Sequence, residues 1–248
     1  MYLEIDGRRI ERFGQVSDMK QVLDMKNASL TTTLSVEDKA QVQYSYYALR
    51  QLPFSALVDV TITANKDIEI TPCSVMEAPD MLKDVENYYN QIDRPHALIS
   101  LLTSTAKSPT GKLLVAASNS FIFDEAHHAP PALIHEMWDN GLHLLKFRKK
   151  LQKGETYHFA IVGSAMTSAQ HEDPLNEVER LTMYAALQGA PQLIAQHKNA
   201  WSELWKSDII VDGDAQVQQE ARSMMYHLYS FVREGSGYGI SLQSIGRS

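Results

Sequence analysis

The spacing of apolar residues changes partway along this chain of 248 residues. Up to about Gly163, apolar and polar positions alternate with a period of two, as in strands that bury one face. From Ser164 onward the apolar positions recur every three to four residues, as in amphipathic helices. The sequence therefore predicts an antiparallel β-sandwich followed by helices, with the boundary near Met166.

Turn signals divide the first part of the chain into strands. Asp6-Gly7 is expected to turn a hairpin, and Asn27 is expected in the left-handed conformation, which asparagine tolerates. Further strands are expected over residues 22–33, 42–49, 55–63, 67–72, 96–104, 112–123, 141–151 and 154–163. Two segments break the alternation, so residues 77–92 are predicted as a loop or short helix and residues 124–137 as a loop.

The second part of the chain predicts helices. Residues 176–188 are expected to form a helix that stops at Gly189, and Pro191 then lies in the first turn of the next one. That helix places six side chains on one face: Leu193, Ile194, His197, Trp201, Leu204 and Trp205. Asp214 is a suitable N-cap for a last helix, which Gly235 is expected to end. Its apolar stripe consists of Val217, Ala221, Met224, Met225, Leu228, Phe231 and Val232.

The segment that carries the last two helices resembles a known family. Residues 200–235 read AWSELWKSDIIVDGDAQVQQEARSMMYHLYSFVREG. This stretch is similar to the linker helix and first barrel helix of glycoside hydrolase family 65, which contains the maltose, kojibiose and trehalose phosphorylases and their hydrolase relatives. The similarity is close from about Gly154 and looser before it. Family members continue into a Gly-His and Phe-Trp-Asp segment, whereas this chain reads GYGISLQSIGRS.

The resemblance implies a mainly β fold with C-terminal helices. Residues 1–165 would form a large antiparallel β-sandwich of the galactose-mutarotase supersandwich type, incomplete at its N-terminal side. Residues 166–210 would form a helical linker, and residues 211–248 the first helix of a truncated α/α-barrel catalytic domain. The function implied is that of the N-terminal portion of an inverting α-glucoside phosphorylase or hydrolase, acting on a disaccharide such as maltose, kojibiose or trehalose.

The implied chemistry is inversion at an α-glucosidic bond. A carboxylic acid protonates the leaving oxygen while phosphate or an activated water attacks the opposite face of the sugar. In the family these groups lie beyond residue 248, so no catalytic residue is assigned here and the chain alone is expected to be inactive. No cofactor is expected, apart from inorganic phosphate as the co-substrate of a phosphorylase.

Three polar residues are candidates for substrate binding. The resemblance places the end of the last helix at the rim of the sugar pocket, which makes Arg233, Glu234 and Tyr238 the nearest polar groups. A solvated helix end with an ion pair explains Arg233 and Glu234 as well. Asp124 and Glu125 are not assigned as acids, because neither has a partner carboxyl group at a meaningful spacing.

Composition narrows the range of partners. A net charge of -7 argues against nucleic acid, which requires clustered Lys and Arg, and the basic cluster at residues 146–150 is interpreted as a solvated strand end. The N-terminus has no apolar signal core and no run approaches transmembrane length. We therefore expect no membrane contact and a cytoplasmic protein, unless an export signal has been lost with a missing part. The expected partners are a disaccharide and a second copy in a homodimer.

The sequence gives only weak evidence for a metal site, a nucleophilic cysteine or a phosphate-binding loop. His127, His128 and His135 match no standard zinc spacing, so no metal site is expected. Cys73 stands at the end of a predicted strand without a catalytic signature around it. Residues 108–112 (Ser-Pro-Thr-Gly-Lys) lack the strand–loop–helix context of a phosphate-binding loop.

The aromatic residues of the helices have two interpretations. Trp201 and Trp205 lie four residues apart on an apolar face, where packing is favoured over a sugar platform. The stripe around Met224 and Met225 is interpreted as core. A stand-alone sandwich that binds carbohydrate or a partner subunit without catalysis remains the alternative function. An apolar helix face left exposed would favour the truncated enzyme over that alternative.

Overall fold

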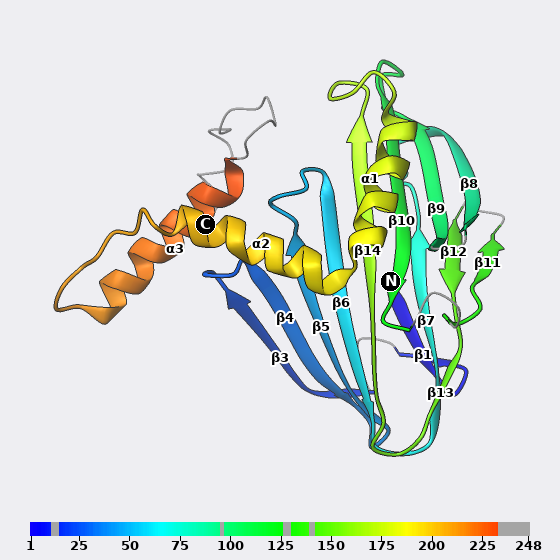
Figure 1. Ribbon diagram of the computed structural model, residues 1–248, viewed down its shortest axis with the longest axis horizontal. Helices are drawn as coiled ribbons and strands as arrows, with labels where there is room; N and C mark the ends of the chain where they lie inside the picture. Colours follow the sequence, from blue (N-terminus) through cyan, green and yellow to red (C-terminus); the bar gives the residue numbers. More distant parts are fainter. Residues whose placement is uncertain (11–14, 95–96, 126–129, 139–141, 233–248) are drawn as a thin grey trace.

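The computed structural model describes residues 1–10, 15–94, 97–125, 130–138 and 142–232 (Figure 1). Its strands are β1 Tyr2–Ile5, β2 Arg8–Arg9, β3 Val16–Asp24, β4 Ser29–Val36, β5 Ala40–Ala48, β6 Ser55–Ala64, β7 Ile68–Met76, β8 Lys83–Arg94, β9 Ala97–Lys107, β10 Leu114–Phe123, β11 Ile134–Met137, β12 His143–Lys146, β13 Lys149–Leu151 and β14 Thr156–Thr167. Three helices follow: α1 Pro174–Gln188, α2 Ala190–Leu204 and α3 Ala215–Phe231.

The strands form two antiparallel sheets. The larger has eight strands in the order β3-β4-β5-β6-β14-β10-β9-β8. The smaller has six, in the order β11-β12-β7-β1-β2, with β13 also pairing with β7. The predicted fold class, mainly β with C-terminal helices, is confirmed.

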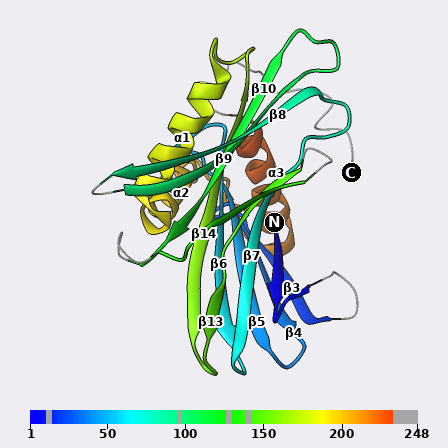
Figure 2. The ribbon, with the colours of Figure 1, turned by 90° about the vertical axis from the view of Figure 1, so that its right-hand side faces the viewer.

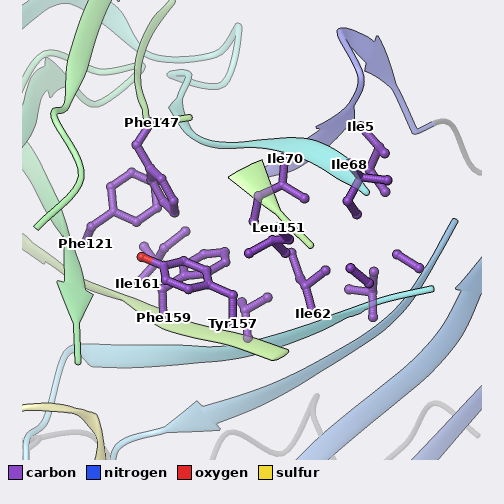
Figure 3. Close-up of a cluster of buried hydrophobic side chains, with 14 of the residues drawn as sticks. Ile5, Ile62, Ile68, Ile70, Phe121, Phe147, Leu151, Tyr157, Phe159 and Ile161 are labelled. Carbon is purple, nitrogen blue, oxygen red and sulfur yellow. The ribbon is translucent and has the colours of Figure 1, made fainter. Parts of the chain in front are cut away.

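The main hydrophobic core lies between the two sheets (Figure 3). Strand β6 supplies Val60 and Ile62 at alternate positions, both almost fully buried. Phe147, from the smaller sheet's side, meets Phe121 and Phe159 of the larger sheet with ring centroids 5.2 and 5.3 Å apart, both edge-on. Burying one such ring stabilises a fold by about 1.5–3 kcal/mol, so this cluster holds the sheets face to face.

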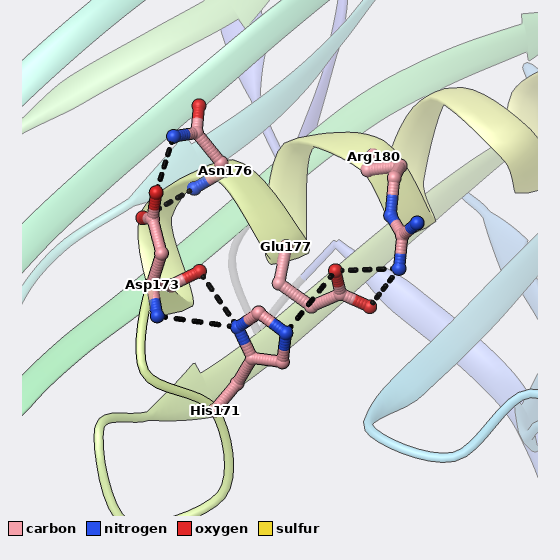
Figure 4. A network of polar contacts seen from close by, with 5 residues as sticks. All are labelled: His171, Asp173, Asn176, Glu177 and Arg180. Carbon is pink, nitrogen blue, oxygen red and sulfur yellow. Dashed lines mark hydrogen bonds and ion pairs between the residues drawn. The ribbon is translucent and has the colours of Figure 1, made fainter.

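The first two helices cover the opposite face of the larger sheet (Figure 2). Helix α1 buries Val178, Thr182 and Ala185 against it. Gly189 has a φ of 78°, which glycine adopts without strain, and there α1 ends and α2 begins. The start of α1 is fixed by a polar network (Figure 4): Asp173 accepts from the backbone N–H of Asn176 at 3.2 Å.

Most predicted elements are present. The hairpin turns at Asp6 and Gly7, with φ of 53° and 74°. Asp214 caps α3 by accepting from the N–H groups of Gln216 and Val217 at 2.9 and 3.1 Å. Pro191 lies in the first turn of α2. None of the helices in the described ranges combines the length and apolar character needed to cross a lipid bilayer.

Three strand predictions were wrong. Residues 83–94, within the predicted loop or helix, form β8, the edge strand of the larger sheet. The segment 141–151 is not one strand but two, β12 and β13, separated by the fully buried Phe147. The predicted loop 124–137 ends in a strand, β11.

Three local predictions were also wrong. The left-handed residue is Ala28, with φ of 47°, because the side chain and N–H of Asn27 are both bound to Asp24. Cys73 lies inside β7 and is fully buried, not at a strand end. In the basic cluster, Arg148 and Lys150 are exposed as predicted, but Lys146 is mostly buried and pairs with Glu136 at 2.5 Å.

Candidate functional site

The predicted substrate-binding residues Arg233, Glu234 and Tyr238 lie outside the described residues, as does Gly235. His127 and His128 also lie outside them, whereas His135 is stacked on Tyr89 with centroids 4.6 Å apart. Within the described part of the chain, no three His, Cys, Asp or Glu side chains gather in a group that could hold a metal ion. The structure does describe helices α2 and α3, which lead to the predicted site. They pack against each other and against the sandwich, and they leave one face of α3 exposed.

Trp201 and Trp205 both pack against other parts of the protein. Trp201 is only 4% exposed and stacks on Tyr226 of α3 with centroids 5.4 Å apart. Trp205 donates its indole N–H to the carbonyl oxygen of Met25 at 3.2 Å and meets Tyr229 edge-on. Neither ring is an open sugar platform, so the packing interpretation is confirmed.

His197 joins α2 to two turns of the sandwich. Its Nδ1 accepts from the backbone N–H of Arg50 at 3.1 Å, and its Nε2 donates to the carbonyl oxygens of Asn27 and Ala28 at 3.0 and 3.3 Å. An amide N–H can only donate and a carbonyl only accept, so these partners assign the neutral Nε2–H tautomer. The ring is fully buried. The sequence placed His197 on an apolar face, and a histidine at such a position was the only sign of its polar role.

Arg50, in the turn between β5 and β6, reaches the end of α3. Its guanidinium donates to the carbonyl oxygens of Tyr229 and Val232, both at 2.6 Å, and lies 5.2 Å from the ring centroid of Trp201. A cation at the C-terminus of a helix satisfies free carbonyls and opposes the negative end of the helix dipole. Arg50 therefore fixes the C-terminal end of α3, next to the predicted site. No sequence motif predicts this role.

The segment before α3 is also fastened to it. Asp208 accepts two hydrogen bonds from Arg222, at 3.0 and 2.6 Å. The side chain of Gln218 accepts from the N–H of Val211 and donates to the carbonyl of Ile209, both at 2.8 Å. These contacts set the angle at which α3 leaves α2.

The remaining face of α3 is apolar and open. Met225 is buried, but Met224 is 68% exposed. The prediction that the stripe around Met224 and Met225 is core was therefore wrong for Met224, Leu228 and Phe231, because α2 covers only the side with Met225, Tyr226 and Tyr229. The exposed side chains, which we call the α3 stripe, are Val217, Met224, Leu228 and Phe231. Large open apolar surfaces of this kind mark sites of association.

A charged cluster on the sandwich is a second place where ionisable groups gather. His158 on β14 contacts Asp59 through Nε2 at 2.7 Å and Asp124 through Nδ1 at 2.6 Å. The hydrogen bond to Asp59, its charge and the contact with Asp124 raise the pKa of His158 to about 9, against the opposing effect of burial. Glu125, next in the chain, pairs with Lys149 at 3.1 Å. Both ring nitrogens of His158 face carboxylates, so the protonated ring donates to Asp59 and Asp124 and binds the strands together.

This cluster predicts a loss of stability at alkaline pH. An unfolded histidine has a pKa near 6.5, so folding binds extra protons between about pH 6.5 and 9, and the stabilisation is complete below that window and lost across it. Because Asp124 is 56% exposed, we expect a loss of about 1–2 kcal/mol rather than the full value. Urea unfolding at pH 6 and pH 9.5 measures it. In His158→Gln the unfolding free energy should change less between these two pH values than in the parent. An equal change in both proteins would contradict the assignment of the pH dependence to His158.

Comparisons with known proteins agree with the arrangement of sandwich and helices. The sequence profile described as "Glycosyl hydrolase family 65, N-terminal domain" matches residues 1–204. A kojibiose hydrolase of Mucilaginibacter mallensis is 55% identical over all of this chain and 36% of its own length, and one of Flavobacterium johnsoniae is 44% identical over 95% of this chain and 34% of its own.

A solved structure gives the same fold. The structure named "Putative kojibiose phosphorylase from human microbiome" superimposes with a TM-score of 0.69 over 94% of this chain and 30% of its own, at 11% sequence identity. The chain thus spans about a third of the length of the curated relatives it matches. With a family profile that matches most of its residues, the chain belongs to glycosyl hydrolase family 65.

Proposed function

We propose that this chain is the part of a disaccharide-cleaving enzyme that supports a catalytic domain, and that the α3 stripe is the surface on which that domain rests. The observation that carries the proposal is the contrast between the two sides of α3. One side is fixed to α2 and Arg50 by aromatic contacts and hydrogen bonds. The other presents large apolar side chains to solvent. A helix that is fixed on one side and apolar and exposed on the other is suited to a permanent interface within one protein.

The proposed substrate of the whole protein is kojibiose, and the proposed reaction is hydrolysis with inversion. The two curated relatives at 55% and 44% identity are named kojibiose hydrolases, which favours water over phosphate as the attacking group. In such a reaction a carboxylic acid gives its proton to the leaving oxygen as the glycosidic bond breaks, while a carboxylate takes a proton from the water that forms the new bond. The carboxyl groups would come from the catalytic domain.

The described carboxylates of the sandwich cluster do not form such a pair. Asp59 and Asp124 both hold His158, and Glu125 holds Lys149. An inverting pair flanks the sugar with a gap of roughly 6.5–9.5 Å for substrate and water. These three carboxylates are committed to structural ion pairs instead, which agrees with a catalytic centre located elsewhere in the protein.

The proposal is tested with a chimera. The purified chain should release no glucose from kojibiose. The same chain put in place of the matching region of the M. mallensis hydrolase should give an enzyme that releases glucose from kojibiose, with an inverted anomer visible by NMR. Turnover by the chain alone would place the catalytic groups within it. A folded chimera without activity would favour the alternative of a non-catalytic binding module.

A further inference from the structure

Two histidines meet between the sheets at the end of the sandwich that lies away from α3 (Figure 1). His143 of β12 is fully buried, and its Nε2 lies 2.9 Å from the hydroxyl of Ser104 on β9. His135 of β11 stacks on Tyr89 of β8. The two imidazole rings meet edge-on with centroids 5.7 Å apart. Strands of both sheets therefore hold this pair of rings.

Each ring has a buried nitrogen without a protein partner. The Ser104 hydroxyl donates to Oδ1 of Asn87 at 2.6 Å. Because a serine hydroxyl has one hydrogen, His143 must donate its Nε2–H to Ser104. Nδ1 of His143 then carries a lone pair, and it has no hydrogen-bond partner among the described protein atoms. Nε2 of His135 is buried without such a partner as well. Buried polar atoms of this kind are rare in proteins and indicate a bound water or ion.

Two methionines lie beside the histidines. His143 is paired with Met76 of β7 on one side and with Met137 of β11 on the other. Residues paired across antiparallel strands have neighbouring side chains on the same face of the sheet. His135 precedes Met137 by two positions and so shares this face. The four side chains, which we call the His–Met cluster, are Met76, His135, Met137 and His143. Spacing along the chain does not reveal the cluster, because its members come from three strands.

The charge around the cluster limits the kind of ion. Desolvation and the neighbouring His135 lower the pKa of His143 to about 4, and burial lowers the pKa of His135, so both rings are neutral near pH 7. Glu136 alternates with the cluster residues of β11 and is paired with Lys146. The four ligand side chains are thus uncharged. Because the cost of burying an ion rises with the square of its charge, such a set favours a monovalent over a divalent ion.

We propose that the His–Met cluster is a binding site for a soft monovalent metal ion, Cu(I). Thioether ligands select Cu(I), and imidazole also suits copper. The hydrogen bond from His143 to Ser104 holds one ring in place, as outer contacts do around metal-binding histidines. Stacking on Tyr89 holds the ring of His135. Met137 is 58% exposed and gives the ion access from solvent. The cluster includes no residue of α2 or α3, so this proposal does not depend on the proposed function.

Copper titration of the purified chain tests the site. All proteins carry Cys73→Ala, so that the buried thiol does not compete for Cu(I). Without oxygen, the chain should take a single Cu(I) ion from its coloured complex with bicinchoninate. Met137→Leu keeps the size of the side chain but removes the sulfur, and it should bind Cu(I) at least about 10-fold more weakly. Met19→Leu is the matched control, because Met19 is 56% exposed on β3 of the other sheet. It should bind like the parent.

A second variant and a spectrum identify the ligands. His135→Gln should also weaken Cu(I) binding, and X-ray absorption of the bound copper should show both nitrogen and sulfur neighbours. Melting without copper is measured for each variant, so that binding is compared only between folded proteins. Three results would each overturn the proposal: no uptake of Cu(I) by the chain, equal affinity in the parent and Met137→Leu, or tighter binding of Zn(II) than of Cu(I). Glucose release by the chimera tests the proposed function separately.

Discussion

Replacing Trp201 by alanine is expected to destabilise the chain by about 3–4 kcal/mol, the usual cost of removing a buried aromatic side chain. The ring is 4% exposed and lies between Tyr226 of α3 and the guanidinium of Arg50. Its loss leaves a cavity at the point where α2, α3 and the β5–β6 turn meet. For a chain of this size the melting temperature should fall by about 10 °C, and the α3 amides should lose most protection from hydrogen exchange.

Trp201→Phe is the matched control. The indole N–H of Trp201 is buried and has no hydrogen-bond partner among the described protein atoms. Phenylalanine keeps most of the apolar surface and removes this unsatisfied donor, whose burial costs about 1–3 kcal/mol. We therefore expect Trp201→Phe to lie within about 1 kcal/mol of the parent. Equal melting of parent and alanine variant would show that Trp201 does not anchor the helices.

The strands that follow local rules could be predicted from the sequence, and β8 shows where those rules fail. Val85 and Tyr89 of this strand, with Met81 and Leu82 just before it, recur at helical spacing, which suggested a loop or short helix. In the structure β8 is an edge strand that pairs only with β9 in the described chain, from Lys83↔Lys107 to Arg94↔Ala97. Because both faces of an edge strand are half exposed, a strict apolar–polar alternation is not required. The pairing of β8 with β9 therefore determined the structure of this segment, against the helical spacing of its apolar residues.

The helical end was predicted in outline but not in its contacts. The N-cap Asp214 and the stripes on α2 and α3 depend on spacing, which a sequence displays. The roles of Arg50 and His197 depend on the meeting of a turn and a helix, because the two residues are 147 positions apart and are joined by a hydrogen bond from Arg50 N–H to His197 Nδ1. No local pattern encodes that meeting. A histidine on an otherwise apolar helix face was the one available signal.

Changing the α3 stripe should leave the isolated chain intact and abolish activity in the chimera. Met224→Glu combined with Leu228→Lys replaces two exposed apolar side chains by a pair at i, i+4 that supports the helix. In the chain alone, the free energy of unfolding should change by less than about 0.5 kcal/mol, as for most surface substitutions. In the chimera both charges would be buried at the domain contact at a cost of about 3–5 kcal/mol, so kojibiose hydrolysis should fall by at least about 100-fold.

The control places the same charges on the polar side of the same helix. Gln219→Glu with Ser223→Lys keeps the spacing and the net charge change, but both positions point away from the α3 stripe by the 100° advance per residue. This variant should retain activity within about twofold. If both pairs of substitutions lowered activity equally, helix stability rather than the stripe would be responsible. If neither did, the catalytic domain would rest elsewhere, and the exposed side chains of α3 would need a different partner.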